Sequence, residues 1–284
     1  MVIQTMEIIF SFKGEVLTAM TCVKDKVIII TGSTSGVGES CALEAAKNGA
    51  GGIVITGRDT QRGEAVKTAV EALGTDAIFV AAELADPEQC RNIVTQCDAK
   101  WGRVDGLVNS AADTNRGTLE TTTVEFWDYQ MNVNVRAPFL LTQECVKIMQ
   151  REKIAGSIVN ILSVAGFCGM DILCSYSTTK GALRTLTKNN AHALRRHQIR
   201  VNGINLGWTD TPKEHVVQQA QGSPKDWLET AEAASPFGRL LKPDDVAKLV
   251  NYLLSDDSGI LTGSCIDYSQ RVLGVFPPEN VVLD

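Results

Sequence analysis

Several features that mark specialised protein classes are absent from this 284-residue sequence, or scarce in it. Its eight cysteines form no C-x-x-C pair, and its three histidines lack metal-ligand spacing, so no metal site is expected. Aromatic residues make up 6% of the chain and charged residues 21%, whereas 44% is hydrophobic, which excludes disordered, collagen-like and low-complexity classes. We therefore expect a globular protein of a reducing compartment, the cytoplasm, with cysteine used as a small apolar residue.

An excess of basic residues is also lacking, because 27 Lys and Arg stand against 33 Asp and Glu, for a net charge of −6. This balance argues against nucleic acid as a partner, since nucleic-acid-binding proteins present a basic face. Residues 1–20 have no basic start, and Glu7, Lys13 and Glu15 interrupt their apolar runs, so neither a signal peptide nor a membrane span is expected. We interpret residues 1–20 as an N-terminal extension of unknown role, with Met20 as an alternative start.

From Lys26 onward, short apolar runs rich in β-branched residues alternate with longer amphipathic segments. The expected strands lie at residues 27–30, 53–56, 77–80, 104–108, 156–162, 199–206 and 264–268. Continuous apolar strands separated by helices indicate a parallel sheet that is covered on both faces. No repeat, charged block or linker interrupts this pattern. Residues 21–284 are therefore expected to form one α/β domain: a three-layer, doubly wound, Rossmann-type parallel sheet of about seven strands.

A glycine-rich turn, TGSTSGVG at residues 31–38, joins the first expected strand to the first expected helix. Its three glycines allow a tight turn and a close approach of the backbone to a pyrophosphate. The helix that follows offers unpaired N–H groups and the positive end of its dipole to this anion. The turn therefore predicts a dinucleotide site, although its spacing differs from the common G-x-G-x-x-G fingerprint and a purely structural turn is the alternative.

A second motif places Tyr176 and Lys180 four residues apart in an expected helix, and thus on one face of it. Tyrosine normally titrates near pH ~10, and a neighbouring ammonium favours the phenolate, so the pair can act as a general acid and base. Ser163 ends the fifth expected strand, thirteen residues before Tyr176, at the edge where parallel sheets bind ligands. Asn134 lies in a helical stretch after the fourth strand.

Together with the glycine turn, these four residues have the order and spacing of the catalytic residues of the short-chain dehydrogenase/reductase family, which the chain resembles from Lys26 onward. The family signatures are T-G-x-x-x-G-x-G and Y-x-x-x-K. The resemblance implies that Tyr176 exchanges a proton with the substrate oxygen, which Ser163 orients. It also implies that Lys180 binds the cofactor ribose and lowers the pKa of Tyr176, and that Asn134 holds a water linking Lys180 to solvent.

Three segments depart from the family pattern. N-N-A-G becomes NSAA at residues 109–112, and P-G-x-x-x-T becomes LGWTDT at residues 206–211, which keeps the threonine but loses a rigid proline. The C-terminal D-G-G is replaced by SQR at residues 269–271. None of these changes touches the four catalytic candidates.

Asn132 competes for the asparagine role, and Asn134 is preferred because residues 134–137 match the family's N-x-x-A pattern.

The end of the second expected strand bears on the choice of cofactor. In the family, an acid there bonds the 2′-hydroxyl of NAD, and Gly57 stands at that position in this chain. Arg58 follows, where a guanidinium can pair with the 2′-phosphate of NADP, so NADP is favoured over NAD. The alternative is that Arg58 is a solvated loop residue or pairs with Asp59. Glu83, after the third strand, is a candidate for the adenine site or an exposed surface residue.

The resemblance thus implies an enzyme that transfers a hydride between a nicotinamide cofactor and a small carbonyl or secondary alcohol substrate. The residues expected to hold the cofactor are Gly32, Ser33, Thr34, Ser35, Gly36, Val37, Gly38, Arg58, Glu83, Leu84, Asn109, Ala111, Tyr176, Lys180, Gly207, Thr209 and Thr211. Residues 208–241 are expected to close over the substrate as a lid. A homotetramer or homodimer is expected to form through two long helices, at about residues 134–152 and 175–196. The alternatives are a catalytically silent dinucleotide-binding regulatory protein, and an epimerase or dehydratase that recycles its cofactor.

Overall fold

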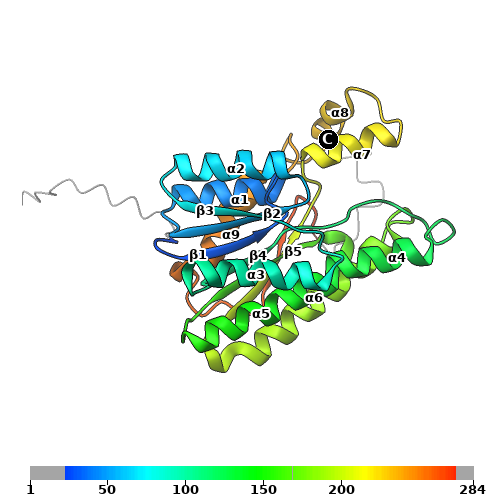
Figure 1. Cartoon of the computed structure of the whole chain (residues 1–284). Helices are drawn as coiled ribbons and strands as arrows, with labels where there is room; N and C mark the ends of the chain where they lie inside the picture. Colours follow the sequence, from blue (N-terminus) through cyan, green and yellow to red (C-terminus); the bar gives the residue numbers. More distant parts are fainter. Residues whose placement is uncertain (1–22, 168, 273–284) are drawn as a thin grey trace, which may run out of the picture.

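The computed structural model describes residues 23–167 and 169–272, so the expected extension over residues 1–20 lies outside the described part of the chain. Seven parallel strands form one sheet in the order β3-β2-β1-β4-β5-β6-β7 (Figure 1). The strands are β1 (Val27–Thr31), β2 (Gly52–Gly57), β3 (Asp76–Ala81), β4 (Gly106–Asn109), β5 (Ser157–Ser163), β6 (Arg200–Leu206) and β7 (Cys265–Tyr268). The predicted doubly wound parallel sheet is confirmed.

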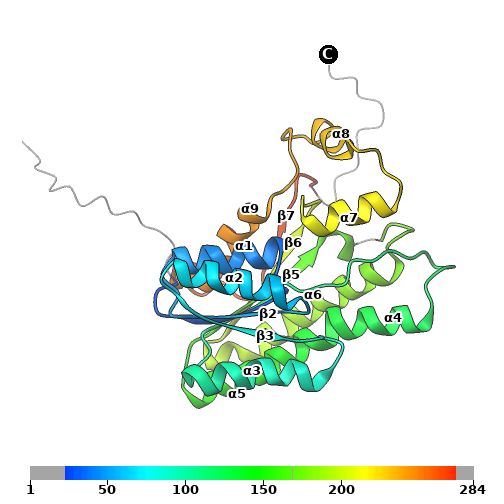
Figure 2. The same ribbon diagram turned by 45° about the horizontal axis from the view of Figure 1, so that its top comes forward.

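Helices cover both faces of the sheet, as Figure 2 shows. One face carries α1 (Gly36–Lys47), α2 (Thr60–Ala72) and α9 (Pro243–Leu254), and the other carries α3 (Pro87–Trp101), α5 (Ala137–Arg151) and α6 (Cys174–Leu194). The remaining α-helices are α4 (Val124–Met131), α7 (Pro212–Ala220) and α8 (Trp227–Ala233). Among the described residues, no helix is both long and apolar enough to span a membrane.

Strand β1 shows why the strands are apolar along their whole length. Ile28 and Ile30 pack into the core cluster that contains α1 and α9, whereas Ile29 packs into the cluster that contains α3 and α5. All three side chains are fully buried. Because successive side chains of a strand point to opposite faces, a sheet covered on both faces needs apolar residues at every position.

The helix expected from Asn134 onward is interrupted at its start. Residues Asn132–Arg136 form a π-helical turn between α4 and α5, in which the N–H of Ala137 donates to the carbonyl of Asn132. Pro138 explains this turn, because it has no N–H for the carbonyl of Asn134, four residues before it. Such turns widen a helix locally by one residue.

The strand order changes direction between β1 and β4, since the chain first builds the sheet outward to β3 and then returns to add β4 on the other side. Crevices at such a reversal, beyond the carboxyl ends of the strands, are where open parallel sheets bind ligands. Helices α7 and α8 stand beyond this edge in both views (Figures 1 and 2).

A chain of buried hydrogen bonds ties the middle of the sheet to α6, and we expect it to be important for stability. Asn109 Nδ2 donates to Asn160 Oδ1 at 2.8 Å, and Asn160 Nδ2 donates to Thr187 Oγ1 at 2.9 Å. Asn160→Ala should lower the free energy of unfolding by about 2–3 kcal/mol, because it leaves the buried Asn109 amide without its acceptor. Denaturant unfolding measures this loss, with the exposed Asn92→Ala on α3 as control. Equal stability of the two variants would contradict the expectation.

Candidate active site

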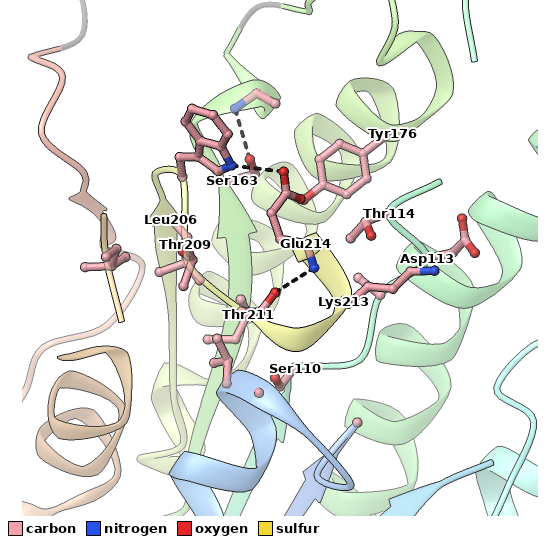
Figure 3. A pocket seen from close by; sticks show the side chains of 18 of the residues that line it. Ser110, Asp113, Thr114, Ser163, Tyr176, Leu206, Thr209, Thr211, Lys213 and Glu214 are labelled. Carbon is pink, nitrogen blue, oxygen red and sulfur yellow. Dashed lines mark hydrogen bonds between the residues drawn. The ribbon is translucent and has the colours of Figure 1, made fainter. Parts of the chain in front are cut away.

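A cleft of about 1750 Å³ opens at the carboxyl edge of the sheet, between the loops that follow the strands and helix α7 (Figure 3). Most of the residues expected from the sequence line it. They are Gly32, Thr34, Ser35, Gly36, Val37, Gly38, Arg58, Glu83, Leu84, Ala111, Ser163, Tyr176, Lys180, Gly207, Thr209 and Thr211. Segments far apart in the chain therefore meet in one place, as the resemblance implied.

The glycine turn has the geometry that an anion cradle requires. Gly32 and Gly36 have φ of +65° and +59°, a region that favours glycine. A Cβ at Gly32 would lie 2.8 Å from the Cα of Ala111, and a Cβ at Gly38 would collide with the carbonyl of Gly32. Helix α1 begins at Gly36, so its free N–H groups face the cleft beside this bare backbone. These residues fit the pyrophosphate of a dinucleotide.

Three of the expected site residues are not among those that line the cleft, and their side chains have structural roles instead. Ser33 is fully buried; its hydroxyl donates to the carbonyl of Ile30 at 2.6 Å and accepts from the N–H of Thr56 at 3.0 Å. Asn109 donates to Asn160, as described above. Asn134 is the third. These side chains hold the strands and loops on which the cleft is built.

The side-chain amide of Asn134 forms hydrogen bonds through both its oxygen and its nitrogen to the backbone of Asp113, in the loop after β4. Its Oδ1 accepts from the N–H of Asp113 at 2.8 Å, and its Nδ2 donates to the carbonyl of Asp113 at 2.9 Å and to Thr179 Oγ1 at 3.1 Å. The side chain is 1% exposed. Both polar atoms of the side chain thus fix the loop after β4, and the water-holding role that the resemblance implied for Asn134 stays a prediction.

At the end of β2, the structure explains the missing acid. A Cβ at Gly57 would lie 2.6 Å from Cγ2 of Thr34, so the side chain of the glycine turn occupies the space that an acid would need. Arg58 follows with a side chain that is 70% exposed and reaches across the cleft. Its guanidinium donates to the Tyr129 hydroxyl at 3.0 Å and lies 3.4 Å from the Glu83 carboxylate.

A second guanidinium at this end of the cleft was missed by the sequence analysis. Asp59 caps α2 by accepting from the N–H of Arg62 at 3.0 Å, and it also pairs with Arg62 Nε at 2.8 Å. Asp59 is therefore the partner of Arg62 rather than of Arg58. Arg62 lines the cleft. Its position only four residues after Arg58 could have indicated from the sequence that it also lies at this end of the cleft.

The proton-transfer candidates meet beside the end of β5. Ser163 and Tyr176 both line the cleft here, and the Ser163 hydroxyl accepts from the N–H of Ala165 at 3.1 Å. Lys180, one turn after Tyr176 on α6, donates through Nζ to the carbonyl of Ile161 at 2.7 Å. Its Nζ lies 5.7 Å from the centre of the Tyr176 ring. A hydroxyl pair with an adjacent amine is suited to binding a substrate oxygen and exchanging a proton with it.

The chain is similar to known proteins in sequence and in fold. A family model described as enoyl-(acyl carrier protein) reductase matches residues 32–269. The chain is 34% identical over 242 residues to a 3-oxoacyl-(acyl-carrier-protein) reductase of Thermotoga maritima, covering 85% of this chain and 95% of that one. It is 33% identical over 244 residues to an NADP-dependent (R)-specific alcohol dehydrogenase of Lentilactobacillus kefiri, covering 85% and 94%. A short chain dehydrogenase of Burkholderia cenocepacia, solved with NADP, superposes with a TM-score of 0.77 at 28% identity, covering 87% and 97%. This chain belongs to the short-chain dehydrogenase/reductase family.

Membership confirms the reaction class that the sequence predicted. This short-chain dehydrogenase/reductase is an NAD(P)-dependent oxidoreductase that acts on a hydroxyl group or the corresponding carbonyl. The alternative of a catalytically silent binding protein is not supported, because these relatives are named as oxidoreductases.

Burial sets the electrostatics of the two titratable residues. It raises the pKa of Tyr176 to about 12, with the Ser163 hydrogen bond lowering it and the charge of Glu214 raising it further. Burial also lowers the pKa of Lys180 from 10.5 to about 8. The resemblance implied a lowered tyrosine pKa, whereas here the opposing effect of burial is larger. Tyr176 therefore carries its proton at neutral pH.

Burial of the Lys180 ammonium should lower the free energy of unfolding of the enzyme. A base whose pKa is lower in the folded state leaves the unfolded chain with more bound protons between pH 8 and 10.5, so stability rises with pH across this window. The full cost, about 3 kcal/mol, applies below pH 8.

Lys180→Met should therefore raise the free energy of unfolding at pH 7 by about 1–2 kcal/mol, once the loss of the hydrogen bond to Ile161 is subtracted. Denaturant unfolding at pH 7 and pH 9.5 measures the difference, which should shrink at the higher pH. Lys147→Met on α5, an exposed site, is the control. A gain that does not change with pH would count against a buried charge at Lys180.

Proposed function

We propose that this enzyme interconverts a ketone and a secondary alcohol with NADP(H), and that Tyr176 is its general acid and base. The observation that carries the proposal is the convergence of the Tyr176 and Ser163 hydroxyls beside Lys180, at the cleft where the glycine turn offers bare backbone to a pyrophosphate. When bound, the nicotinamide supplies or accepts the hydride at the substrate carbon. The protein supplies position and the proton.

In the direction of reduction, Ser163 donates a hydrogen bond to the substrate carbonyl and Tyr176 gives its proton to the same oxygen. The high pKa of Tyr176 suits this direction at neutral pH, because the phenol is fully protonated there. In the direction of oxidation, the phenolate is needed, so the rate should increase with pH. Lys180 would bond the ribose hydroxyls of the cofactor, and Asn134 would keep the loop at Asp113 in place.

The regions outside this centre support further roles. We infer that residues 208–241, which include α7 and α8 beyond the sheet edge, act as the substrate lid, since several of them line the cleft. We expect self-association as a dimer or tetramer through α5 and α6. A reducing, cytoplasmic location suits the described cysteines, which are free thiols: Cys41, Cys90, Cys97, Cys145, Cys174 and Cys265.

Tyr176→Phe tests the mechanism. It should lower kcat by about 100-fold or more, because the phenylalanine ring has no proton to transfer. Cofactor binding should remain, as measured by the rise in melting temperature with NADP⁺ and NADPH. Tyr252→Phe on α9, away from the cleft, is the matched control and should keep full activity. A Tyr176→Phe enzyme that retains its rate would rule out this mechanism.

The preference for NADP rests on Arg58 and Arg62, which line the cleft after β2, and on Gly57, which stands where an acid would bond the NAD ribose. Arg58→Ala and Arg62→Ala should each raise the KM for NADPH by about tenfold, since a hydrogen bond to a charged group contributes about 1.5–3 kcal/mol. The KM for NADH should change little. Steady-state kinetics with both cofactors measures this, with Arg91→Ala on α3 as control. Equal effects on the two cofactors would exclude a contact with the 2′-phosphate.

A further inference from the structure

Glu214 occupies a helix position where its side chain would normally serve the helix itself. It is the third residue of α7, after the N-cap Thr211, whose hydroxyl accepts from the N–H of Glu214 at 3.2 Å. A threonine followed three residues later by a glutamate is the capping-box pattern, in which the glutamate bonds back to the N–H of the cap. Here the carboxylate turns instead toward the cleft, where it meets other donors.

Three side chains hold this carboxylate in place, and all of them bind the same oxygen. Glu214 Oε1 accepts from Arg116 at 3.0 Å, from the indole N–H of Trp208 at 3.0 Å and from Gln218 at 2.7 Å. The Glu214 side chain is only 16% exposed. None of these three bonds uses Oε2. A fixed, mostly buried carboxylate thus keeps one oxygen available for a hydrogen-bond donor.

The carboxylate of Glu214 lies close to the proton-transfer groups. Figure 3 shows Glu214 pointing toward Tyr176 and Ser163, and its charge acts on the Tyr176 phenol. Glu214, Arg116, Trp208 and Gln218 all line the cleft. A substrate whose oxygen is bound by Tyr176 and Ser163 therefore brings its neighbouring substituents close to this carboxylate.

We propose that Glu214 determines substrate specificity by accepting a hydrogen bond from a second hydroxyl group of the substrate, close to the reacting carbon. The substrate class is then a hydroxyketone and the corresponding diol. A neutral donor fits better than a cation, because Arg116 already balances the charge of Glu214. An apolar or anionic substituent would leave the carboxylate oxygen desolvated without a partner, which is costly. This inference rests on the proposed function.

The other role open to Glu214 is purely mechanical. Its ion pair with Arg116 joins α7 to the loop that follows β4, and could hold the lid closed without touching the substrate. A lid contact of this kind would affect all substrates alike. A specificity contact would affect only those that carry the second hydroxyl.

The two roles are separated by kinetics with 2-hydroxycyclohexanone and cyclohexanone, using NADPH. The wild-type enzyme should favour the hydroxyketone in kcat/KM by about tenfold or more, as one charge-assisted hydrogen bond provides. Glu214→Met removes the acceptor at similar side-chain length and should abolish the preference while preserving reduction of cyclohexanone. Glu214→Gln, which keeps the shape and loses the charge, should reduce it in part. Glu229→Gln on α8 is the matched lid control.

A second measurement separates a nearby charge from a structural effect. Loss of the negative charge in either Glu214 variant should shift the pH profile of alcohol oxidation to lower pH, because Tyr176 ionises more readily. Equal losses on both ketones, or a wild-type enzyme without preference between them, would overturn the inference and leave the proposed function standing. A wild-type enzyme that reduces neither these ketones nor any other would overturn both.

Discussion

The whole site depends on how closely two backbones approach at the end of β1. Gly32 lies against the backbone of Ala111 in the loop after β4, and Gly38 lies against the carbonyl of Gly32. Thr31 secures the same junction, since its hydroxyl donates to Val108 and accepts from the N–H groups of Ser110 and Ala111. Any side chain at these glycines would separate the loops. The contact therefore fixes the glycine turn relative to the loop after β4, at the edge of the sheet where the cleft opens and Tyr176 lies.

Burial of the two proton-transfer groups, Tyr176 and Lys180, works against both stability and the charged forms used in catalysis. Burial holds Tyr176 protonated and makes Lys180 a weaker base, and both effects oppose the charged forms that part of the catalytic cycle requires. The Ser163 hydrogen bond is the favourable interaction that acts on the phenol directly. The same desolvation strengthens every polar contact made to a substrate in the cleft.

How much was predictable varies with the kind of residue. The parallel sheet follows from the alternation of apolar runs and helical segments, and the place of Ser163 at the binding edge follows from the rule that parallel strands present their carboxyl ends together. The strand order was not predicted, and the pairing of Ser163 with Tyr176 was implied only by the resemblance. The use of Ser33 and the Asn134 amide as internal ties could not be predicted, because it depends on which strands lie beside them. The orientation of Glu214 was equally hidden, since its sequence pattern indicates a helix cap. Its carboxylate is turned elsewhere by Gln218 on the same helix, by Trp208 in the preceding loop and by Arg116 far away in the sequence.

The π-helical turn at Asn132–Arg136 also has a consequence for the chain's length at this point. Such a turn stores one residue more than a regular helix would need. Removing one residue from this turn would rotate α4 by about 100° relative to α5. Tyr129 and Gln130 would then swing away from Arg58 and Asp113, their present partners. The number of residues in this turn, together with Pro138, thus keeps Tyr129 and Gln130 facing their partners beside the cleft.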